Sequence, residues 1–190
     1  MHESKTRYQK YRVMVTRKDV ETYFRVHGTI NIDNDIVNIN GFATLINIMI
    51  NELPFQFGKV DYDFYCDNAN LTNLKGCPHT VGNNFNCSHN ELTSLEGGPH
   101  TVGEQYYCFN NTNLISLTGL PDTVGGEFRI DWNKNLPMLQ LVKLNNVTIY
   151  NRASLTEIMG KYCGQKPLRQ AIIQCQRELI DAGFKENARL

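Results

Sequence analysis

A repeat of 21 to 22 residues constrains this chain more than any other feature of its sequence. The clearest copies are LTNLKGCPHTVGNNFNC at 71–87, LTSLEGGPHTVGEQYYC at 92–108 and LISLTGLPDTVGGEFRI at 114–130. Each has two Leu three positions apart, then Gly, Pro, a Thr-Val-Gly triplet, an aromatic residue and finally Cys or Ile. Looser copies extend the register backwards to 57–66 and forwards to 136–149. One copy is too short to bury its apolar side alone, so four to six coils must stack.

Each copy is predicted to contribute one short strand, at 64–66, 85–87, 106–108 and 128–130. Alternate side chains of a strand point to the same side, which places Cys66, Cys87 and Cys108 on one inward ladder. Cysteine suits such a ladder because it is small and commonly buried. We therefore interpret the six cysteines as reduced residues, not as a disulfide framework.

The chain contains 22 Asn, far more than ordinary usage gives. The segment FNCSHNEL at 85–92 fits the end of the pattern L-x-L-x-x-N-x-L, in which a buried amide satisfies the backbone groups of a turn. This predicts such a role for Asn90, for Asn111 or Asn113, and for Asn133. Ala69 occupies the position where the first full coil would need Asn.

The Pro-His or Pro-Asp pairs and the Thr-Val-Gly triplets are interpreted as turns. Gly82, Gly103 and Gly125 close the triplets and are available for the positive φ that many turns need. The predicted fold class is an α/β repeat solenoid, a short leucine-rich-repeat-like array with one strand per coil. Helical caps are expected at both ends.

Residues 1–56 are predicted to form the N-terminal cap, 57–158 the solenoid and 159–190 the helical C-terminal cap. Thr16 is a predicted N-cap, with Asp19 at the capping-box position, for a helix through about Arg25. Polar and apolar residues then alternate at 29–32, and 41–53 is expected to be a helix or a distorted first coil. Pro167 is expected to begin a helix that ends before Gly183.

Formal charge balances to zero, so the whole molecule offers no strong field to nucleic acids or anionic membranes. The ends are basic: 1–18 carry six bases and one acid, and 161–190 carry six bases and three acids. Basic ends leave open an alternative function as a nucleic-acid-binding accessory protein. No stretch approaches the eighteen apolar residues of a membrane span, so we expect a cytoplasmic protein without a membrane partner.

The segments LPFQFGKVDYDFYC, LTNLKGCPHTVG and NNFNCSHNELTSLEGGPHTVG, with the tail CQRELIDAGFKENARL, resemble a family of leucine-rich-repeat-like proteins of large tailed bacteriophages. The resemblance covers about residues 16–190, with 41–53 departing from the family's regular first coil. It implies no catalytic residues. It does imply an early or accessory phage product that acts on host or defence proteins in the bacterial cytoplasm.

Two Cys-x-His pairs, Cys77 with His79 and Cys87 with His89, have spacings that zinc sites use. The repeat argues against such a site, because Cys87 belongs to the inward ladder and Cys77 has no counterpart in later copies. The same burial argues against a Cys87–His89 nucleophile pair. We therefore expect no metal and no cofactor.

Catalytic signals are otherwise missing from the sequence. The carboxylates that could form an acid–base pair fall on predicted surface positions in coils at the two ends of the array, namely Asp63, Asp67, Glu127 and Asp131. The sequence contains no P-loop, dinucleotide fingerprint or G-x-S-x-G motif. The chain is therefore predicted not to be an enzyme.

Residues between the inward positions form two predicted outward columns. The first column contains Tyr65, Asn86, Tyr107, Arg129 and Thr148, and the second contains Asp67, Ser88, Phe109, Asp131 and Tyr150. The predicted partner-binding residues are Tyr65, Asn86, Tyr107, Phe109, Arg129, Asp131, Trp132 and Tyr150. Tyr, Trp and Arg are enriched at protein interfaces, so we predict a protein-binding module. The resemblance to the phage family implies that this module docks on a bacterial host or defence protein and inhibits it. The alternatives are that these aromatics only cover the core edge or pack against a cap, or that the chain is a virion structural protein.

Overall fold

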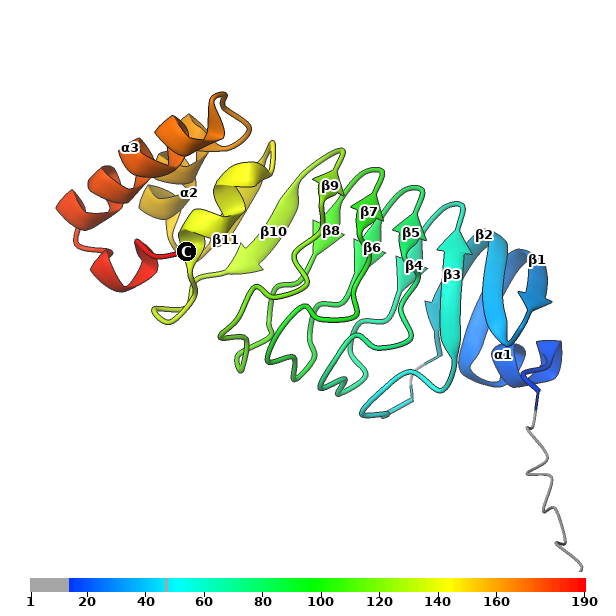
Figure 1. The fold of residues 1–190 in the computed structure, drawn as a ribbon. Helices are drawn as coiled ribbons and strands as arrows, with labels where there is room; N and C mark the ends of the chain where they lie inside the picture. Colours follow the sequence, from blue (N-terminus) through cyan, green and yellow to red (C-terminus); the bar gives the residue numbers. More distant parts are fainter. Residues whose placement is uncertain (1–13, 47) are drawn as a thin grey trace, which may run out of the picture.

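The computed structural model describes residues 14–46 and 48–190 (Figure 1). They form an elongated β-solenoid of about five turns, with coils of about 21 residues and helices at both ends (Figure 1). The predicted fold class is therefore confirmed. The basic segment 1–13 lies outside the described residues.

Two ladders of parallel strands run along the solenoid, where the sequence predicted one. The first ladder contains β4 (Phe64–Tyr65), β6 (Phe85–Asn86), β8 (Tyr106–Tyr107), β10 (Phe128–Asp131) and β11 (Val147–Tyr150). The second contains β3 (Gln56–Val60), β5 (Thr80–Val81), β7 (Thr101–Val102) and β9 (Thr123–Val124). The Thr-Val pairs that we interpreted as turns are therefore the strands of this second ladder.

The glycine after each Thr-Val pair allows the coils to approach closely at the corner between the two ladders. Positive φ is found instead at glycines such as Gly76 and Gly97, so our expectation for the corner glycines was wrong. A Cβ on Gly82 would lie 1.9 Å from the carbonyl oxygen of Asp61, and one on Gly103 would lie 1.8 Å from that of Gly82. Glycine is required here because only it leaves room for the backbone of the preceding coil.

The N-terminal end consists of one helix and one hairpin. Helix α1 (Arg17–Tyr23) begins at the predicted capping box of Thr16 and Asp19, and it ends before Arg25 because Phe24 already belongs to β1. Strand β1 (Phe24–Asp33) pairs antiparallel with β2 (Ile36–Leu45), and β2 pairs in parallel with both β3 and β4. Residues 41–45 are thus part of β2 rather than of a helix.

The C-terminal end is helical, as predicted, but it contains more elements. A 3-10 helix, η1 (Met138–Lys143), precedes β11, after which come α2 (Ala153–Tyr162), α3 (Leu168–Asp181) and η2 (Lys185–Asn187). Helix α3 begins after Pro167, and Gly183 follows its end with a φ of 85°. The expected boundary at 158 falls within α2, which the sequence did not predict. None of the described helices has the length and apolar character needed to cross a bilayer.

Sulfur and aromatic side chains fill the interior next to the first ladder. Cys66, Cys87 and Cys108 are at most 1% exposed, so the predicted inward ladder is confirmed. Beside it the rings of Phe64 and Phe85 are 6.1 Å apart, and those of Phe85 and Tyr106 are 4.8 Å apart. These contacts continue from one coil to the next, as stacking of identical units requires.

Buried asparagines satisfy the backbone between coils, also as predicted. The Asn90 amide accepts hydrogen bonds from the backbone N–H groups of Ala69 and Leu71 and donates to the carbonyls of Cys66 and Cys87. Asn111, not Asn113, takes this role in the next coil: it accepts from the Leu92 N–H and donates to the carbonyls of Cys87 and Cys108. Asn133, which is only partly buried, donates to the Leu114 carbonyl. This network fixes the stacking distance because a coil that moved would leave buried polar groups without partners.

Candidate functional site: the outer face of the first ladder

The outward side chains of the first ladder form a continuous surface. We call Tyr65, Asn86, Tyr107, Phe109, Arg129, Asp131 and Tyr150 the outer stripe. All seven are partly exposed. The parallel register aligns Tyr65 with Asn86, Asn86 with Tyr107, and Tyr107 with Arg129. The stripe therefore has the regular spacing of adjacent strands.

An aromatic cluster occupies the centre of the outer stripe. The Phe109 ring lies 5.2 Å from that of Tyr150 and 6.3 Å from that of Tyr107. His89, which the sequence reasoning did not include, lies 5.4 Å from Phe109 in an edge-on contact. The alignment of copies could have identified His89, since it follows the outward column by one residue. Rings that already contact one another lose little freedom on binding.

Arg129 is fixed above this cluster by two partners, Tyr107 and Glu127. Its guanidinium carbon lies 5.2 Å from the centre of the Tyr107 ring, and its Nε lies 2.5 Å from Oε2 of Glu127. The other oxygen of Glu127 accepts a hydrogen bond from the Thr148 hydroxyl. Burial opposes ionisation of Glu127, but the hydrogen bonds from Thr148 and Arg129 outweigh it and hold its pKa below the ordinary value. The ion pair is thus a built part of the surface.

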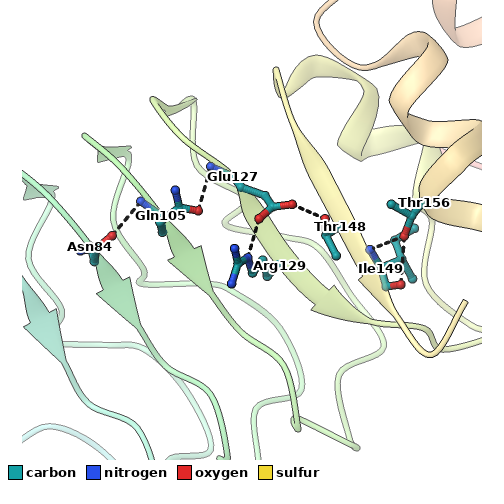
Figure 2. A network of polar contacts seen from close by, with 7 residues as sticks. All are labelled: Asn84, Gln105, Glu127, Arg129, Thr148, Ile149 and Thr156. Atoms are coloured by element: carbon teal, nitrogen blue, oxygen red, sulfur yellow. Dashed lines mark hydrogen bonds and ion pairs between the residues drawn. The ribbon is translucent and has the colours of Figure 1, made fainter. Parts of the chain in front are cut away.

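A polar column runs beside the outer stripe, one residue before each inward aromatic (Figure 2). The Asn84 side-chain oxygen accepts from the Gln105 N–H at 3.1 Å, and the Gln105 oxygen accepts from the Glu127 N–H at 3.2 Å. At the far end the Thr156 hydroxyl of α2 bonds to both backbone groups of Ile149 in β11. We predicted Glu127 only as a solvated charge. Alignment of the copies would have revealed the column, since each residue occupies the same position.

The N-terminal end of the outer stripe lacks such pairing. Asp63 accepts hydrogen bonds through one oxygen from the backbone and side chain of Asn84. Within residues 14–46 and 48–190, neither Asp63 nor Asp67 forms an ion pair. Tyr65 lies between them in sequence, and its pKa is raised, first by partial burial and then by the negative charge of Asp63. Tyr65 therefore stays neutral at physiological pH.

Trp132 packs against the C-terminal cap, which is the alternative we considered for the aromatics. Its indole N–H donates to the Asn187 side chain at 3.3 Å, and the Arg152 guanidinium carbon lies 4.2 Å from its ring. Trp132 and Asp131 also line a cavity of about 280 Å³ together with Asn110 and several neighbouring residues. Trp132 thus joins β10 to the cap and borders the outer stripe.

Ser88 differs from its predicted outward position, because it is fully buried. Strand β6 ends at Asn86, so the alternation of side chains no longer determines where residue 88 points. Its hydroxyl has no hydrogen-bond partner among the described residues.

The structure places the Cys87 thiol where it cannot act as a nucleophile. The thiol is buried and donates to the Tyr107 carbonyl, and burial raises its pKa well above the ordinary value. His79, from the other Cys-x-His pair, contacts His100 on the second ladder with ring centres 5.9 Å apart. The described part of the chain contains no group of three or more His, Cys, Asp or Glu side chains arranged to hold a metal ion.

Searches against protein-family models, curated proteins and solved structures find no match to this chain.

Proposed function

We propose that this chain is a non-catalytic binding module that docks on another protein through the outer stripe. The observation that supports this is a contiguous set of partly exposed aromatic rings with a fixed arginine, centred on Tyr107, Phe109, Arg129 and Tyr150. Side chains of these types supply most of the binding energy at protein interfaces.

Rigidity and charge favour a protein partner. Backbone hydrogen bonds between coils hold the strands, so the surface is ordered before it binds. The stripe and its flanks carry three guanidiniums, of Arg25, Arg129 and Arg152, against four carboxylates, namely Asp63, Asp67, Glu127 and Asp131. Such a surface has no excess of positive charge to attract the phosphates of DNA and RNA.

The family resemblance supplies the proposed biological setting. On that basis the module is a phage accessory protein whose partner is a bacterial host or defence protein, which it inhibits in the bacterial cytoplasm.

The test is to capture a partner from bacterial lysate, identify it and measure its affinity for purified variants. Tyr107→Ala combined with Phe109→Ala should weaken binding by more than about tenfold, since truncating a central interface aromatic typically costs about 2 kcal/mol. The matched control is His79→Ala with His100→Ala, which removes two contacting rings from the second ladder. The proposal is wrong if both double variants, each with wild-type thermal stability, bind the partner as tightly as the wild type.

A further inference from the structure

The outer stripe contains one arginine site that the chain fills itself. In that site the Tyr107 ring lies under the Arg129 guanidinium, and Glu127 accepts from Arg129. The guanidinium comes from the strand next to the tyrosine, at the aligned position. Stacking on an aromatic face together with a carboxylate acceptor is the arrangement that guanidinium groups prefer.

Two coils earlier the tyrosine of this arrangement recurs without its guanidinium, and Asn84 stands at the position of Glu127. Tyr65 is aligned with Asn86 on the next strand, as Tyr107 is with Arg129. The short Asn86 side chain cannot reach across the Tyr65 ring, and its oxygen is engaged by the Ser88 N–H at 3.0 Å. The place that Arg129 occupies in one pair is therefore open in the other.

Acceptors for a guanidinium flank this open place on both sides. Asp63 and Asp67 lie two residues before and two residues after Tyr65, all three are partly exposed, and the charges of both carboxylates act on the Tyr65 hydroxyl. Asp63 uses one oxygen for Asn84, which leaves the other for a new donor. Arg25 lines a cavity of about 310 Å³ together with Asp67, but these two described residues form no ion pair with each other.

From the uncovered Tyr65 ring and the two carboxylates beside it, we infer that Tyr65, Asp63 and Asp67 form a binding site for an arginine side chain of the partner protein. The inference rests on the proposed function and adds the chemistry of the partner, which must present an exposed arginine. The partner's guanidinium would lie on the Tyr65 ring and bond to the flanking carboxylates. Lysine would fit less well, because its ammonium group cannot stack as a plane or donate a fork of parallel hydrogen bonds.

The test is an NMR titration of the full chain with acetyl-Gly-Arg-Gly-amide, with acetyl-Gly-Lys-Gly-amide as the matched probe. The arginine peptide should shift the amide signals of residues 63–67 and 86, with an affinity at least about threefold higher than the lysine peptide. Asn86→Arg should abolish these shifts because it supplies the missing guanidinium from within the chain. Tyr65→Leu and the pair Asp63→Asn with Asp67→Asn should weaken them.

Two controls separate this site from general charge effects. Thr93→Arg adds the same charge at an exposed position outside the stripe, and Glu96→Gln removes an exposed carboxylate there. Both variants should bind the arginine peptide as the wild type does. Equal shifts with the two peptides, or unchanged arginine binding in Asn86→Arg, would overturn the inference.

The outcome is separable from that of the proposed function. If the captured partner still depends on Tyr107 and Phe109 while the arginine peptide leaves residues 63–67 unshifted, the arginine site is wrong and the binding face stands. If the partner is indifferent to Tyr107 and Phe109, the binding face itself is wrong, whatever the peptides do.

Discussion

At the scale of single residues, the thiols show how the interior of the solenoid is maintained. Cys66, Cys87 and Cys108 are small enough to lie on adjacent strands and apolar enough to stay out of water. Their burial raises the pKa of each, so none is ionised in the folded chain at physiological pH. In the C-terminal cap burial likewise raises the pKa of Cys163 and Cys175 to about 12.

These raised pKa values predict a loss of stability in alkali. Thiols of the unfolded chain ionise near pH 8.5, about the ordinary value, whereas the folded ones keep their protons. The contribution of each buried thiol to the free energy of unfolding is therefore complete below that pH. Above it, this free energy falls by about 1.4 kcal/mol per pH unit for each thiol. Urea unfolding at pH 7.5 and 9.5 under reducing conditions measures this loss. In Cys87→Ala the difference in the free energy of unfolding between the two pH values should be smaller by about 1.4 kcal/mol. A difference equal to that of the wild type would contradict this role of the Cys87 thiol.

Tyr106 stands where other coils have Phe, and its hydroxyl is buried without a hydrogen-bond partner among the described residues. The neighbouring Gly98 makes room for it, since a Cβ there would lie 3.2 Å from the hydroxyl oxygen. Tyr106→Phe should therefore leave the free energy of unfolding unchanged or raise it by about 1 kcal/mol. A loss of more than about 1 kcal/mol in chemical denaturation would show that the hydroxyl is bonded after all.

At the scale of elements, the sequence predicted what the repeat period determines. The period and the alternation placed the inward thiols, the buried Asn90 and the outward columns. The sequence pattern could not reveal the second ladder of strands, because a Thr-Val pair is too short to show periodicity. Helix α2 was missed because its N-cap, Arg152, makes no side-chain cap and Gly160 lies within it. The role of Trp132 depends on Asn187, 55 residues away, which no local pattern reports.

The corner between the ladders predicts a strong effect for a single methyl group. Gly103→Ala places a Cβ 1.8 Å from the backbone oxygen of Gly82, and the coils must separate to accept it. It should lower the free energy of unfolding by more than about 3 kcal/mol. The matched control is Gly160→Ala in α2, where the added Cβ would meet nothing within 4 Å apart from the backbone of its own helix, and there alanine should stabilise by up to about 1 kcal/mol. Similar stabilities for the two variants in thermal unfolding would contradict the corner packing.

At the scale of the whole molecule, a stacked interior holds an ordered exterior in place. Because each coil repeats the same inward ladder, the side chains between them form a surface whose spacing is set by the strands. The residues predicted from the sequence lie on that surface, with Trp132 at its border and the buried Ser88 excluded from it. The sequence could not predict the ring contacts, the ion pair and the hydrogen bonds within this surface, because they depend on distances between coils.

Hydroxyl-radical footprinting of the chain alone and with its captured partner is the decisive test of the outer stripe as the binding face, because it reports the solvent access of individual side chains. The account predicts that Tyr65, Tyr107, Phe109 and Tyr150 become protected in the complex. His79 and His100 on the second ladder should remain as accessible as before. Protection of the second ladder with an unchanged outer stripe would contradict the account.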